Sequence, residues 1–76
     1  MVGIVTRDRR VYKNVLRVDL GVSPLDPIYK QIEYADQMSG YKFEKLYVLK
    51  DYCHWFPETT RIVQMAEYRG AEIIYI

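Results

Sequence analysis

The chain has 76 residues, of which 50% are hydrophobic and 28% charged, a composition typical of folded globular proteins rather than of disordered ones. The formal net charge of +1 excludes a global field that would draw the protein to nucleic acid or to an acidic membrane surface, and the apolar runs are too short to span a bilayer. We expect a single domain over residues 1–76, with a core so small that self-association or a partner would add stability. Cys53 is the only cysteine, so an internal disulfide is excluded, which is typical of a cytoplasmic protein.

The first two elements are predicted to form a β-hairpin. Val2–Thr6 is rich in β-branched residues, and a second strand-like run covers Val11–Leu20, where apolar and charged residues alternate. Alternation of this kind is typical of a strand with one buried face. The polar stretch Thr6–Arg10 would be the turn between the two strands.

A helix is predicted next, beginning at Ser23 or at Asp26, because either side chain can cap a first helical turn. The apolar residues that follow recur at three- and four-residue steps: Leu25, Ile28, Ile32, Ala35 and Met38. This spacing predicts an amphipathic helix that ends at Ser39 and Gly40.

The second half of the chain is predicted to form a strand, a helix and a strand. Phe43–Leu49 ends in four consecutive apolar residues, a pattern typical of a central parallel strand covered on both faces. A helix follows from about Thr59 to Arg69, with Gly70 as its C-cap. Glu72–Ile76 is a final apolar strand, and since the sequence places nothing after it, we expect its outer edge to be free.

In chain order the predicted elements are β-β-α-β-α-β, which indicates an α/β fold. We expect a small mixed sheet of about four strands in two or three layers with the helices. Right-handed crossovers would make the last three strands parallel. The central strand and both helices should share one core, to which we assign Leu46, Val48, Ile32, Ile62 and Val63.

The segment Asp51–Thr60 follows the central strand, where open α/β sheets gather their ligands. Cys53 and His54 lie there and could act as nucleophile and base. Neighbouring residues of an extended chain point to opposite sides, however, so we expect both to have structural or surface roles. With Asp51 they also supply too few ligands for a metal site. The sequence therefore predicts no catalytic residue, no metal and no cofactor.

Exposed aromatic and edge residues favour binding to another protein. The residues that we assign to such a surface are Tyr52, Trp55, Phe56, Ile74 and Ile76. The last strand of two copies can also pair antiparallel, which predicts a homodimer. An alternative is a small nucleic-acid-binding module that uses the basic N-terminal cluster: Arg7, Arg9, Arg10, Lys13 and Arg17.

The element order and the stretch Lys45–Ile76 resemble a truncated STAS domain, the domain of anti-sigma factor antagonists. In that family a buried strand leads to an Asp-Ser-Ser-Gly-like loop that opens a helix, and a glycine-containing stretch returns to the sheet. Leu46–Leu49 resembles the strand, Phe56–Thr60 the loop and Arg69–Ile74 the return.

The resemblance implies that Glu58 takes the acidic position of the loop and Thr59 the position of the phosphorylated serine, although Arg61 stands where the family has glycine. Capping of a helix start by the same residues is the structural alternative. Small size, aromatic content and a free edge together favour a non-enzymatic regulatory or inhibitory protein, of the kind that small phage or mobile-element genes often encode.

Overall fold

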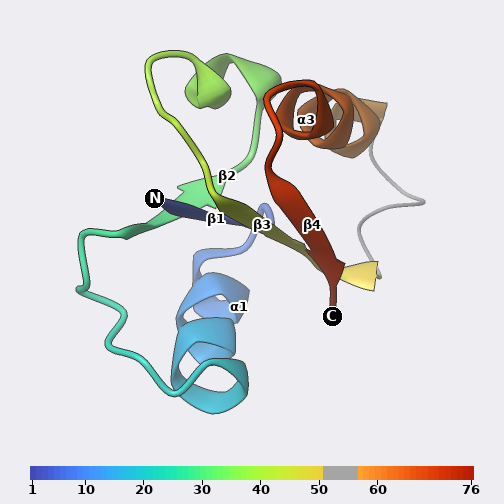
Figure 1. Ribbon diagram of the computed structural model, residues 1–76. Coiled ribbons are helices and arrows are strands. Elements are labelled where there is room, and N and C mark those ends of the chain that lie inside the picture. Colours follow the sequence, from blue (N-terminus) through green and yellow to red (C-terminus); the bar gives the residue numbers. More distant parts are fainter. Residues whose placement is uncertain (51–56) are drawn as a thin grey trace.

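The computed structural model describes residues 1–50 and 57–76. These residues form one sheet of four strands in the order β2-β1-β3-β4, and every neighbouring pair is parallel (Figure 1). The strands are β1 (Val2–Val5), β2 (Tyr29–Ile32), β3 (Lys45–Val48) and β4 (Glu72–Tyr75). The helical elements are α1 (Arg9–Asn14), the π-helical turn η1 (Val15–Asp19) that continues it, the 3-10 turn η2 (Ala35–Met38) and α3 (Pro57–Tyr68). The predicted α/β fold with a sheet of about four strands and two helices is confirmed. The sheet is parallel throughout rather than mixed, because a helical crossover and not a hairpin turn joins the first two strands.

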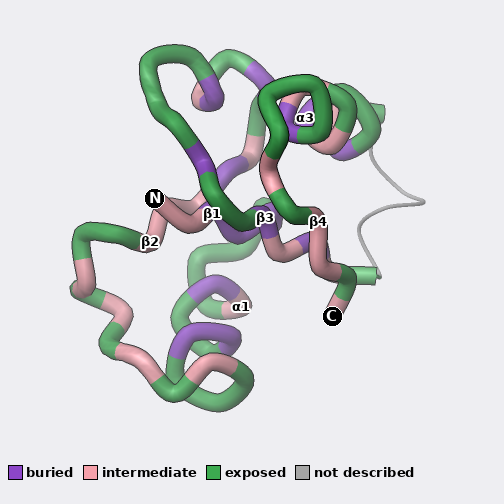
Figure 2. The backbone as a smooth tube through the Cα atoms, in the orientation of Figure 1, coloured by how far each residue is buried: buried purple, intermediate pink, exposed green. Residues whose placement is uncertain are grey.

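The sheet separates two cores, with α1 on one side and α3 and η2 on the other (Figure 1). The core on the α1 side consists of Ile4, Tyr12, Val15 and Leu16. Figure 2 shows buried positions on the strands and on the helical segments that face them. The core on the α3 side contains the five residues predicted to pack together, four of them buried and Val63 partly buried against them. That prediction is confirmed.

The predicted opening hairpin is wrong, because residues 11–20 are largely helical rather than extended. The Asp8 carboxylate caps α1 by accepting a hydrogen bond from the Arg10 N–H at 2.8 Å. Tyr12 and Leu16, four residues apart, are buried, whereas Val18, on the predicted buried face, is 71% exposed. A helix forms here because it places the largest apolar side chains on one face. It also serves as the crossover that lets β2 pair parallel with β1.

The predicted helix over residues 23–38 is also wrong, since this stretch forms a turn, β2 and η2. The expected caps make turns instead: the Ser23 Oγ accepts from the Leu25 N–H at 3.2 Å, and the Asp26 Oδ1 accepts from the Ile28 N–H at 3.1 Å. Such local bonds compete with a helix for the same backbone groups. Leu25, assigned to the apolar stripe, is 89% exposed.

The second half of the chain follows the prediction. β3 lies inside the sheet between β1 and β4, and β4 lies at an edge. Helix α3 begins two residues before the predicted start, and Gly70 follows it with φ of 83°, the left-handed conformation that glycine adopts without strain. No helix in residues 1–50 and 57–76 is long and apolar enough to cross a membrane.

Candidate functional site

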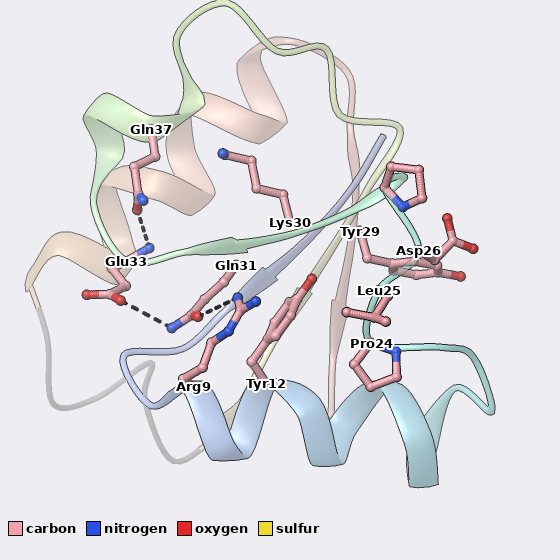
Figure 3. Close-up of a pocket in the computed structure, with 11 residues that line it drawn as sticks. Arg9, Tyr12, Pro24, Leu25, Asp26, Tyr29, Lys30, Gln31, Glu33 and Gln37 are labelled. Carbon is pink, nitrogen blue, oxygen red and sulfur yellow. Dashed lines mark hydrogen bonds between the residues drawn. The ribbon is translucent and has the colours of Figure 1, made fainter.

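A groove of about 450 Å³ lies beside strand β2, which forms the second edge of the sheet. Helix α1 contributes Arg9 and Tyr12, β2 contributes Tyr29 and Gln31, and the turn at 24–27 lines a further part of it (Figure 3). The groove therefore joins the free edge of a sheet to side chains that a separate helix holds in place.

The backbone of β2 is open along this groove. Its inner side is bonded to β1, since the Ile28 C=O accepts from Val2 and the Ile32 C=O accepts from Thr6. Alternate residues of a strand direct their backbone groups to opposite sides, so those of Tyr29 and Gln31 face outward. The Tyr29 N–H is used by the Asp26 C=O at 3.2 Å. The Tyr29 C=O and both backbone groups of Gln31 remain without a backbone partner among the described residues.

The Gln31 side chain lines the groove and is held by three hydrogen bonds. Its Nε2 donates to the Thr6 C=O at 3.1 Å. The Nε2 also donates to the Glu33 Oε1 at 3.2 Å, while the Oε1 accepts from the Arg9 Nη1 at 3.3 Å (Figure 3). The Arg9 guanidinium also lies 4.8 Å from the centre of the Tyr12 ring, within the range of a cation–π contact. These contacts fix the side chains that a bound molecule would meet.

Tyr12 supplies an unpaired polar group. The residue is 2% exposed, and its hydroxyl points from α1 toward β2 (Figure 3) without a hydrogen bond to any described residue. Burial raises the pKa of this hydroxyl above its ordinary value of 10.0, an effect that the Arg9 guanidinium opposes and the Asp26 carboxylate reinforces. At neutral pH the group is therefore a protonated phenol that can both donate and accept.

Of the residues predicted to bind a partner, Ile74 and Ile76 lie at the β4 edge, both partly buried. Tyr52, Trp55 and Phe56 lie outside the described residues, as do the discarded candidates Asp51, Cys53 and His54. Within the described part of the chain, no group of three His, Cys, Asp or Glu side chains could hold a metal ion.

The basic cluster is helical rather than a hairpin tip. Arg9 lines the groove, and Arg7 lies exposed just before the helix. Arg10, Lys13 and Arg17 follow one another at steps of three and four residues and are exposed, which places them on one side of the helix.

Thr59, the residue given the place of the phosphorylated serine, is 4% exposed in the first turn of α3. Its neighbour Glu58 accepts a hydrogen bond from the Ala35 N–H at 2.6 Å and lies 3.6 Å from Arg61. The acidic residue of the loop therefore ties α3 to η2 in this structure.

Comparison with protein-family models, with curated proteins and with solved structures gave no match. The resemblance to a STAS domain stays a prediction.

Proposed function

We propose that this protein is a non-enzymatic regulatory or inhibitory protein of the cytoplasm that acts by binding another protein. The observation that supports this most is the groove beside β2, where open backbone groups adjoin the Tyr12 hydroxyl, which has no hydrogen bond to a described residue. The proposed occupant is an extended segment of the partner, which adds a strand to the sheet at β2.

The backbone of β2 favours an extended peptide over a compact ligand. An added strand pairs with the outward N–H and C=O of Gln31 and donates to the outward Tyr29 C=O, so three hydrogen bonds form without any change in the sheet. Alternate side chains of the added strand then point toward the helical layer, where the groove receives them.

The charges of the groove favour a peptide rather than a polyanion. Arg9 and Lys30 are balanced by Asp26 and Glu33, so the site has no excess charge of either sign. The Tyr12 hydroxyl lines the same groove and can bond a polar side chain of the peptide. Leu25, exposed at the rim, offers an apolar contact beside it.

Displayed libraries of unstructured peptides, selected against the parent protein, would test the proposal. Tyr12→Phe removes one hydroxyl and should weaken the selected peptides about 2- to 12-fold, the effect of one net hydrogen bond. Tyr68→Phe, at a residue that is 94% exposed on α3, is the matched control and should change nothing. If the selected peptides bind the parent and Tyr12→Phe with equal affinity, the groove is excluded as their binding site.

A second pair of variants tests the backbone part of the proposal. Gln31→Pro removes the outward N–H that would bond the peptide, which an edge strand tolerates because that N–H has no partner in the sheet. Gln31→Ala removes the side chain and keeps the N–H. Peptide affinity should therefore fall further in Gln31→Pro than in Gln31→Ala, and equal losses would contradict strand addition.

Nucleic-acid binding is the second candidate, and one feature favours it. Arg10, Lys13 and Arg17 lie exposed on one side of α1 and η1, and none has an ion pair with a described residue. Such a row can contact successive phosphates. Binding to a labelled duplex should then weaken steeply with salt, and Lys13→Ala should reduce the slope of log affinity against log salt by about 1. An unchanged slope would contradict this candidate.

A further inference from the structure

We infer that strand β4 pairs antiparallel with β4 of a second copy, so that two four-stranded sheets join into one. The interface uses the edge opposite the β2 groove and does not depend on what that groove binds.

The hydrogen bonds of β4 identify the groups that face outward. The Glu72 N–H donates to the Glu44 C=O at 2.9 Å, the Ile76 N–H donates to the Val48 C=O at 2.9 Å, and the Ile76 C=O accepts from Lys50 at 3.0 Å. Even-numbered residues of β4 therefore face β3. The N–H and C=O groups of Ile73 and Tyr75 face the edge that no described strand covers, because alternate residues point to opposite sides.

One antiparallel register uses all of these groups. If a two-fold axis passes beside Ile74, Ile73 of one copy stands opposite Tyr75 of the other, and each such pair exchanges two hydrogen bonds. The two-fold axis generates a second, equivalent pair of Ile73 and Tyr75, so four hydrogen bonds form in total. Ile74 then stands opposite its own copy, in a pair without hydrogen bonds where side chains approach most closely.

The side chains of β4 suit a second copy of the same strand. Glu72 is the only charged residue in β4, and in this register it stands opposite Ile76, so no two like charges meet. Ile76 packs at the margin of the core on the α1 side, and Ile74 lies on the same face of the sheet by alternation. Ile74 is only partly buried, and the copy of itself would cover its exposed part.

A disulfide at the two-fold axis tests the register. In a Cys53→Ser background, which removes the native thiol, Ile74→Cys places two thiols on Cα atoms about 4.5 Å apart, within the range that a disulfide spans. Oxidised glutathione should convert this variant to a covalent dimer. Glu72→Cys is the matched control, since its two copies would be about 14 Å apart and should stay unlinked. Linkage of both variants at equal rates, or of Glu72→Cys alone, would overturn the register.

Substitutions of opposite charge at the same position test the interface independently of folding. Ile74→Lys and Ile74→Glu should each sediment as a monomer with the circular dichroism of the parent, while an equimolar mixture should form a heterodimer. If either variant fails to fold, the disulfide experiment still decides, because cysteine is a small apolar replacement. A parent protein that sediments as a monomer at millimolar concentration would overturn the inference, and would leave the peptide test of the β2 groove unaffected.

Discussion

Gly3 lies in the middle of β1, where the structure leaves no room for a side chain. A Cβ atom there would come within 2.7 Å of the Leu46 Cδ1 and 3.2 Å of two ring carbons of Phe43. Carbon atoms in ordinary contact are about 3.5–4.0 Å apart, so the Leu46 side chain would have to move by about 1 Å. Leu46 is fully buried, and the core offers it no space.

Gly3→Ala should therefore destabilise the protein. Overpacking of a core costs about 1–3 kcal/mol, and the loss of glycine from a strand returns about 0.5–1 kcal/mol, so the midpoints of the two ranges leave a net loss of about 1 kcal/mol. A chain of this length has a total stability of about 4–11 kcal/mol, so the change is readily measured. The urea midpoint and the melting temperature of the variant, the latter lower by roughly 4–8 °C, give the value.

A second substitution identifies the cause. Leu46→Val removes the Cδ1 atom and by itself costs about 0.5–1.5 kcal/mol, but it makes room for the methyl of Gly3→Ala. The double variant should lose about 1 kcal/mol less than the sum of the single losses. Gly40→Ala is the control: Gly40 has φ of 80° and no atom within 4 Å of its Cβ position, so its cost should not depend on Leu46. Additive losses for Gly3 and Leu46 would refute the steric explanation.

Four further results are expected. Ile62→Ala should lower the free energy of unfolding by about 2–5 kcal/mol, measured in urea, because Ile62 is fully buried; a loss below about 1 kcal/mol would contradict the core described above. Glu58→Ala should cost about 1–3 kcal/mol by leaving the Ala35 N–H unpaired, whereas Glu58→Gln, which can still accept that bond, should cost less; equal thermal stability of the two variants would count against the bond. The pKa of Tyr12 is higher in the folded than in the unfolded chain, so its contribution to stability is complete below about pH 10 and is lost as the pH rises through the folded-state pKa. Tyr12→Phe should flatten the alkaline fall of the urea midpoint relative to the parent, and parallel curves would show that Tyr12 is not its source. Cys53→Ser and His54→Ala should leave peptide binding by the groove unchanged, and a loss of binding at an unchanged melting temperature would assign them a role in it.

The second half of the fold could be predicted because its signals agree with one another. The four consecutive apolar residues up to Leu49 and their short length favour a strand covered on both faces, and Gly70 marks the end of α3 as expected. In the first half two periods compete. Leu16, Val18 and Leu20 alternate as in a strand, yet Tyr12 and Leu16 also match a helix. The Asp8 cap that decides between them lies in a polar stretch that equally predicts a turn.

The candidate site was missed for the same reason. The helical spacing of apolar residues in residues 23–38 is coincidental. The side chains of Ser23 and Asp26 accept hydrogen bonds from the backbone N–H two residues on, and these turns take the place of a first helical turn. A helix over this stretch would make Gln31 an ordinary surface residue, whereas in the structure it lines the groove. Its contacts with Thr6 and Arg9 span more than 20 residues of chain, and no local pattern reports them.

The strand order places β2 and β4 at opposite edges of the sheet. An assembly paired through β4 would therefore keep both β2 grooves open and would have two binding sites. In the paired assembly the two β2 edges would be the outermost strands, seven strand spacings or about 34 Å apart. A single partner chain could occupy both grooves only if at least about ten extended residues joined its two binding segments. Tethered segments of that length would gain avidity of about 10²- to 10⁴-fold over one segment alone, so the assembly would discriminate between partners by the spacing of their segments as well as by sequence.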